Sequence, residues 1–319
     1  TEVRSYSCTI MPNLPWIAVD DFKQASGWAR PEVRQDRARA YCEMLERGEI
    51  LFFSEPPFKL PVEDRQFLLA QEWAELRMHK NVSYRPGEDV LRGVSGSAAT
   101  VERLRGILRN YSAEVIAFLE KFLAPYAGKW TVDFSSFRPF EEENRDLPLH
   151  KRNDLLHVDA FPSRPTRGGR ILRVFTNLNP AKPRVWNTTE KFEVLARRYA
   201  KGAGLQRIAE ASRLSRTVQD WGEKLGFRGM GRTPYDTFML GFHDYLKENT
   251  AFQKDCPKVW LEFPPSATWL VFTDGVAHAA MSGQYAVEQT FLISPEALVS
   301  PEQAPSRILE TIAGRPLLY

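Results

Sequence analysis

The sequence has 319 residues, of which 43% are hydrophobic and 26% charged, as in a soluble globular protein with one large domain or two small ones. The formal net charge of only +3, without a platform of interleaved basic and aromatic residues, argues against a nucleic-acid partner. Because no apolar run of about 18 residues occurs, we expect no transmembrane helix.

The N-terminal part, residues 1–128, is predicted to be a mostly helical scaffold. Its clearest helix covers residues 100–124, where apolar residues recur every three or four positions and form one buried stripe. Residues 79–96 are predicted to form a loop, in which Tyr84 and Arg85 either face a substrate or simply lie on the surface. Two further helices and a short buried strand are expected at residues 31–47, 62–78 and 50–53.

After residue 128 the pattern changes to the alternation that is typical of strands. We expect the first strands of a β fold in residues 129–186, a helical insertion in 187–258, the last strands in 259–295 and a tail of short helix and coil in 296–319. The acidic residues 141–143 are interpreted as a solvated turn. The individual strands are predicted at residues 130–138, 155–159, 170–179, 259–263, 268–273 and 287–293.

Strands at short spacing with one helical interruption favour an α+β protein. We expect a double-stranded β-helix core, the jelly-roll or cupin-like class, flanked by the N-terminal helices within a single domain of residues 1–319. No glycine-rich phosphate loop follows a predicted strand, which argues against a Rossmann domain.

The tripeptide His157-Val-Asp159 is the first candidate for chemistry. Side chains alternate along a strand, so both polar groups project from the same face. One more histidine would complete the two-histidine, one-carboxylate facial triad of non-haem Fe(II) oxygenases. Among the five histidines of the chain, His278 is the favoured partner because it follows a glycine turn on the late strands. The rival His243 falls in a predicted helix, where capping or packing is the alternative interpretation.

An iron site of this kind usually binds 2-oxoglutarate, whose far carboxylate needs a buried cation. Arg173 lies in the apolar strand after the His-x-Asp motif and is the main candidate, unless it points outward on a half-exposed strand. Arg170 has the opposite parity, so its side chain points to the other face of the strand, and it is the weaker candidate. Arg138 could serve the co-substrate or the substrate.

Residues 160–189 contain six basic residues and no acidic one. The segment is either a solvated loop face or an anion-binding rim beside the metal, to which Arg164, Arg167 and Arg184 would contribute.

Three long motifs resemble the bacterial hydroxylases of 3-deoxy-D-manno-oct-2-ulosonic acid (Kdo). They are HVDAFPSRPTRGGRILRVFTNLNP (157–180), YDTFMLGFHDYL (235–246) and WLVFTDGVAH (269–278). The resemblance implies an Fe(II)/2-oxoglutarate-dependent dioxygenase that hydroxylates Kdo in the inner core of lipopolysaccharide, with Fe(II), 2-oxoglutarate and dioxygen as cofactors. It also implies that His157, Asp159 and His278 hold the iron, and that Kdo-lipid A or a related anionic sugar is the substrate.

One departure from the wider dioxygenase pattern affects the co-substrate. Many dioxygenases carry the oxoglutarate-binding Arg or Lys about ten residues after the distal histidine, whereas residues 287–290 here read Val-Glu-Gln-Thr. Arg173 must therefore supply the cation from the earlier strand.

The sequence also predicts a location and leaves two alternative functions open. Three widely spaced cysteines without a C-x-x-C motif, and first residues without an export signal, favour a cytoplasmic location. The basic insertion with Trp186, Trp221 and Phe227 could contact the anionic surface of the inner membrane, or be a solvated helical lobe. The alternatives are a hydroxylase of another small-molecule or macromolecular substrate, and a non-catalytic sugar-binding jelly roll. The sequence does not predict the oligomeric state.

Overall fold

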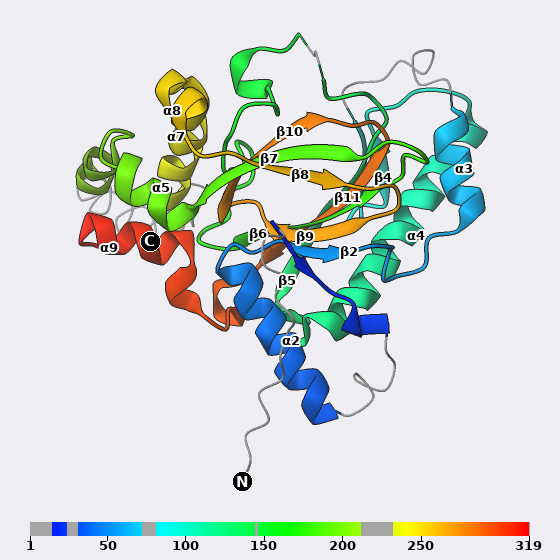
Figure 1. Cartoon of the computed structure of the whole chain (residues 1–319), viewed down its shortest axis with the longest axis horizontal. Coiled ribbons are helices and arrows are strands. Elements are labelled where there is room, and N and C mark those ends of the chain that lie inside the picture. The colour runs from blue at the N-terminus through cyan, green and yellow to red at the C-terminus, as the bar shows by residue number, and fades with distance from the viewer. Residues whose placement is uncertain (1–14, 24–30, 72–80, 144–145, 212–231, 319) are drawn as a thin grey trace, which may run out of the picture.

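The structure, a computed structural model, describes residues 15–23, 31–71, 81–143, 146–211 and 232–318. Two β-sheets face each other in its centre, with helices on the outer face of the larger sheet and a group of helices at one side (Figure 1). In spatial order, the described strands of the larger sheet are β1 (Ile17–Ala18), β2 (Leu51–Phe53), β9 (Thr268–Phe272), β6 (Arg170–Asn177), β11 (Ala286–Ile293), β5 (Trp130–Arg138), β3 (Val82–Arg85) and β4 (Val90–Arg92). Those of the smaller sheet are β10 (Val276–Ser282), β7 (Arg184–Lys191) and β8 (Val259–Phe263).

The helices form two groups. The first packs on the larger sheet and consists of α2 (Pro31–Glu46), α3 (Val62–Ala70) and α4 (Ala98–Phe122). The second lies at one side and consists of α5 (Phe192–Tyr199), α7 (Pro234–Glu248), α8 (Thr250–Asp255) and α9 (Pro305–Ala313). Ser97 caps α4 by accepting a hydrogen bond from the Thr100 backbone N–H, which is why this helix begins where the apolar stripe does.

The alternation of β6 decides which side chains reach the interior. Leu172 and Val174 pack in the core formed with α4, whereas Phe175 packs between the two sheets with Trp186 of β7. Arg173 shares the parity of Phe175 and therefore lies on the inner face, as its place in the sequence predicts. The α+β class is confirmed.

A third core holds the helices at the side. Phe242 of α7 and Leu309 of α9 pack there with Val158, the residue between the two halves of the His-x-Asp motif. The motif is thus held between the sheets and the helical group.

Several predicted elements need correction. Residues 79–96 are not a loop throughout, because β3 and β4 form a hairpin with the larger sheet. Residues 155–159 do not form a strand, since only His157 makes an isolated bridge. The strand β7 was missed, and it runs across position 187, where the insertion was expected to begin. The helix predicted over 62–78 ends at Ala70, because the backbone of Gln71 is extended. Residues 72–80 lie outside the described part of the chain.

Candidate metal centre

His157, Asp159 and His278 converge on one point between the sheets. One possible ligand atom from each lies within 4.8 Å of the others, and all three residues are buried. The backbones of His157 and His278 exchange two hydrogen bonds, with N···O distances of 3.1 and 2.9 Å. A bridge between residues far apart in the chain therefore brings the two imidazoles together.

Both imidazoles are oriented through Nδ1. In His157 this atom lies 2.7 Å from the Leu155 carbonyl oxygen, and in His278 it lies 3.1 Å from the Val276 carbonyl oxygen. A carbonyl oxygen only accepts, so each Nδ1 is the donor and each Nε2 keeps its lone pair for a metal.

Burial keeps these rings neutral. It lowers the pKa of His157 from 6.5 to about 3 and lowers the pKa of His278 as well. Burial by itself raises the pKa of Asp159, but the Arg173 guanidinium and the His157 ring hold it well below its usual value. Two neutral imidazoles and one carboxylate are the donor set that suits a divalent iron, so the residues fit the predicted metal.

Arg173 stands directly beside this centre. Its Nη2 lies 2.9 Å from Asp159 Oδ2, and its Nη1 lies 3.3 Å from Glu288 Oε2 on the neighbouring strand β11. The guanidinium thus connects the candidate ligand to a second buried carboxylate.

The ion pair with Glu288 is the first link of a buried chain of alternating charges. Glu288 Oε1 lies 2.8 Å from Arg138 Nη2, and Arg138 continues to Glu142 at 3.5 Å. Glu142 Oε1 in turn lies 3.1 Å from Arg184 Nη2. Glu142 is only 5% exposed, so the interpretation as a solvated turn is wrong for this residue, whereas Glu141 and Glu143 are exposed.

A cavity of about 130 Å³ opens beside the metal centre. Three nitrogen donors on residues that line it are buried and have no hydrogen-bond partner within the described residues: Arg173 Nε, Arg184 Nε and Trp186 Nε1. Buried donors without partners are costly, and an anionic ligand would satisfy them. The other lining residues are Asn81, Arg138, Asn153, His157, Asp159, Phe175, His278 and Ala280.

Comparison with known proteins decides the family. The sequence matches the family of 3-deoxy-D-manno-oct-2-ulosonic acid (Kdo) hydroxylases over residues 28–316. The chain belongs to the Kdo hydroxylase family. No match was found among curated proteins.

Solved structures of the Kdo hydroxylase KdoO, a non-haem Fe(II) alphaketoglutarate-dependent dioxygenase, are similar over nearly the whole chain. The complex with alphaketoglutarate and Fe(III) has a TM-score of 0.77 and 35% identity, covering 96% of this chain and 98% of that one. The apo structure has a TM-score of 0.75 and 36% identity, covering 89% and 92%. A complex with cobalt(II) also has a TM-score of 0.77 and 35% identity, covering 96% and 98%. The double-stranded β-helix predicted from the sequence is confirmed.

In this Kdo hydroxylase, Arg170 lies away from the cavity. Its side chain is fully buried on the opposite face of β6, where Nε donates to Asp274 at 2.9 Å and the guanidinium covers the Phe272 ring. The opposite parity noted in the sequence accounts for this placement.

The predicted substrate residues are dispersed. Tyr84 is buried and donates from its hydroxyl to Asp89 at 2.9 Å, so it does not face the cavity. Arg167 occupies a surface loop with a φ of +51°, and its backbone N–H donates to Asp236. Arg184 is only 1% exposed, which is incompatible with a place on a basic rim.

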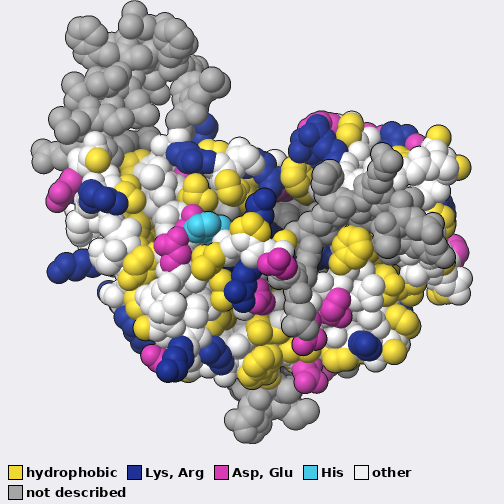
Figure 2. All heavy atoms as spheres, turned by 90° about the horizontal axis from the view of Figure 1, so that it is seen from above, with side chains coloured by type: hydrophobic (Ala, Val, Ile, Leu, Met, Phe, Trp, Pro, Cys, Tyr) yellow, Lys and Arg dark blue, Asp and Glu magenta, His cyan; other side chains and the backbone are white. Residues whose placement is uncertain are grey.

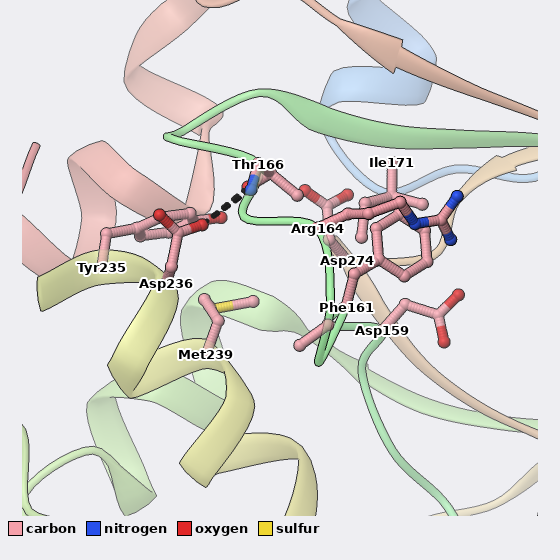
Figure 3. A pocket seen from close by; sticks show the side chains of 10 residues that line it. Asp159, Phe161, Arg164, Thr166, Ile171, Tyr235, Asp236, Met239 and Asp274 are labelled. Carbon is pink, nitrogen blue, oxygen red and sulfur yellow. Dashed lines mark hydrogen bonds between the residues drawn. The ribbon is translucent and has the colours of Figure 1, made fainter. Parts of the chain in front are cut away.

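The loop after Asp159 is fixed by α7. Asp236 Oδ1 accepts hydrogen bonds from the backbone N–H groups of Thr166 and Arg167 at 2.8 and 3.1 Å. Figure 3 shows Asp236 directed at Thr166. Figure 3 also shows the Arg164 guanidinium beside the Phe161 ring, on the side of Asp159. A small cavity of about 10 Å³ lies beneath this loop, between Ile171 and Met239.

Reasoning from the sequence missed Glu288, Glu142 and Trp186 as parts of the site. Glu288 had a signal, because a carboxylate within an apolar strand needs a cation as much as Arg173 needs an anion. His243 does not belong to the group of candidate metal ligands. Its Nδ1 lies 2.9 Å from the Val158 carbonyl oxygen and its ring packs on that of His157.

Proposed function

We propose that this Kdo hydroxylase is an Fe(II)/2-oxoglutarate-dependent dioxygenase that hydroxylates Kdo of the lipopolysaccharide inner core. The observation that carries the proposal is the triad of His157, Asp159 and His278, with both Nε2 atoms left free, on the scaffold of this family. Bound iron would supply the activation of dioxygen, coupled to the oxidative decarboxylation of 2-oxoglutarate to succinate. The chain itself would hold the metal, orient both substrates and exclude water.

The far carboxylate of 2-oxoglutarate is proposed to bind Arg173. Support comes from its buried, unpartnered Nε and its place on the inner face beside Asp159. Arg184 and Trp186 offer further unpartnered donors within the same cavity. Arg170 has no part in this proposal, because Asp274 and the Phe272 ring occupy its guanidinium.

The acceptor is proposed to be Kdo linked to lipid A, with Arg138 as a polar contact at the cavity. A peripheral contact with the anionic inner-membrane surface belongs to this proposal. Trp186 does not contribute to such a contact, because it is 2% exposed between the sheets, and Trp221 and Phe227 lie outside the described residues. On the face in Figure 2, the Lys and Arg side chains of the described residues are mixed with those of Asp and Glu, so the attraction would come from scattered basic groups.

The membrane contact has its own test. Within the described residues no helix is long and apolar enough to cross a bilayer. Binding to anionic liposomes that weakens with salt is expected, and no salt-sensitive binding would contradict the contact.

The test of the activity is succinate release with Fe(II), 2-oxoglutarate, dioxygen and Kdo-lipid A. His157→Ala is expected to lower release by at least a hundredfold because it removes a metal ligand. His150→Ala is the matched control, since that histidine is exposed and pairs with Asp244 at the surface. Equal release by wild type and His157→Ala would contradict the proposal.

A further inference from the structure

Arginine and phenylalanine side chains alternate along the inner face of the larger sheet, beginning at Arg173, which lines the cavity at the metal centre, and continuing outside that cavity. In order from Asp159, they are Arg173, Phe161, Arg164, Phe134 and Arg85. The guanidinium carbon lies 5.9 Å from the Phe161 centroid for Arg173 and 4.5 Å for Arg164. Over Phe134, the distances are 4.0 Å for Arg164 and 4.6 Å for Arg85. We call these five residues the arginine ladder.

Strand pairing explains why the ladder forms. Ser83 of β3 pairs with Ser136 of β5, and Tyr84 pairs with Ser135, so the next position sets Arg85 opposite Phe134. Both then project from the face that carries Ser83 and Ser136, whose hydroxyls lie 3.4 Å apart. The loop after Asp159 adds Phe161 and Arg164, which lie over the inner face of the larger sheet.

The charges of the ladder are least balanced at its outer end. Arg173 pairs with Asp159 and Glu288, which are both buried, and Arg164 pairs with Asp133. Within the described residues, the carboxylate that pairs with Arg85 is Glu88, at 3.3 Å with a side chain 53% exposed. Such an exposed pair contributes little.

The ladder also has hydrogen-bonding capacity left over. The Nε atoms of Arg85 and Arg164 are buried and have no hydrogen-bond partner among the described residues. Burial lowers the pKa of Arg164, and the neighbouring charges of Arg173 and Arg85 lower it further, although Asp133 opposes them. Three guanidiniums that repel one another favour the arrival of an anion.

We propose that Arg85 and Arg164 form a subsite for an anionic oxygen group of the acceptor, either a sugar carboxylate or a phosphate. A guanidinium that lies flat on a phenyl ring keeps its N–H edge available for two parallel hydrogen bonds to such a group. The acceptor then lies along the ladder, with its reacting carbon toward the metal centre. The subsite rests on the proposed function and specifies the part of the acceptor that the protein recognises.

Arg85→Gln tests the subsite, with Arg92→Gln as matched control. Arg92 belongs to the same hairpin and has an exposed side chain that pairs with Glu88, but it is not part of the ladder. Arg85→Gln is expected to raise the KM for Kdo-lipid A about tenfold and to leave kcat and the KM for 2-oxoglutarate within twofold of wild type. Arg85→Lys, which keeps the charge, is expected to recover part of the loss, whereas Arg92→Gln should behave as wild type.

A binding measurement separates this subsite from the activity. The affinity of each variant for Kdo-lipid A is measured without dioxygen, and again after the phosphate esters of the acceptor are removed. A loss that persists in Arg85→Gln identifies the sugar carboxylate as the occupant, and a loss that disappears identifies a phosphate. Equal affinity of wild type and Arg85→Gln overturns the subsite. Arg85-dependent binding without hydroxylation upholds the subsite and contradicts the proposed function.

Discussion

The buried imidazoles should make the metal-free protein sensitive to acid. Because the pKa of His157 falls from 6.5 to about 3 on burial, the unfolded chain takes up a proton first as the pH falls below 6.5. Stability is therefore lost between pH 6.5 and pH 3, and this histidine alone costs about 1.4 kcal/mol at pH 5.5. Urea unfolding of the metal-free protein at pH 7.5 and 5.5 measures the loss. His157→Gln should reduce it, whereas His150→Gln, at an exposed position, should not.

Arg173 supports two functions that can be separated. Arg173→Gln removes a charged donor, so the KM for 2-oxoglutarate should rise about 10- to 100-fold. It also removes the ion pair with Asp159, so iron binding should be measured separately by titration. Arg167→Gln is the control because it lies on a surface loop. An unchanged KM for 2-oxoglutarate in Arg173→Gln would contradict this function of Arg173 and would mean that Arg184 and Trp186 bind the far carboxylate of 2-oxoglutarate.

The helices α7 and α8 replace a missing strand beside the metal-binding segment. Gln253 of α8 accepts a hydrogen bond from the Leu156 backbone N–H at 3.0 Å and donates to the Leu156 carbonyl at 2.8 Å, as a neighbouring strand would. His243 of α7 adds a hydrogen bond to the Val158 carbonyl. Side chains from two helices thus fix the backbone on both sides of His157.

Removing this support should loosen the metal site without removing a ligand. Gln253→Ala is expected to weaken cobalt(II) binding about tenfold, because groups that orient ligands typically change metal affinity by 10- to 100-fold. Gln206→Ala is the control, since Gln206 is exposed and donates to the Ile312 carbonyl, far from the metal-binding segment. A loss of thermal stability in the metal-free protein with unchanged cobalt(II) affinity would limit Gln253 to a structural function.

At the scale of elements, the sequence predicts those helices and strands whose formation depends on a local hydrophobic pattern. The stripe of α4 and the alternation of β5 and β6 are each strong enough to fix an element and the direction of Arg173. The segment around His157 was wrongly predicted to be a strand. Its backbone partners are a single bridge and side chains from helices, and neither produces a periodic pattern in the sequence. Strand β7 was missed for a similar reason, since its pairing with β10 and β8 depends on residues about 70 to 100 positions away. The convergence of Arg138, Glu142 and Arg184 depends on such distant pairing too.

At the scale of the whole molecule, the candidate ligands come from two segments that are far apart in the sequence and meet at the bridge between His157 and His278. His278 belongs to β10 in the smaller sheet, whereas His157 and Asp159 belong to a segment packed against the helical group. A metal bound to all three would strengthen the link that the backbone hydrogen bonds between His157 and His278 already make, and it would bind the unfolded chain far less well.

Metal removal should therefore lower the melting temperature. At a free metal concentration 100 times the Kd, binding adds about 2.7 kcal/mol, which corresponds to roughly 5 °C for a chain of this size. Calorimetry of the protein with cobalt(II), which is stable in air, and of the protein with a chelator measures the shift in melting temperature. His278→Ala should abolish the shift because it removes one of the three ligands, whereas His243→Asn, which keeps a donor for the Val158 carbonyl, should retain most of it. A full shift in His278→Ala would mean that the metal binds without His278.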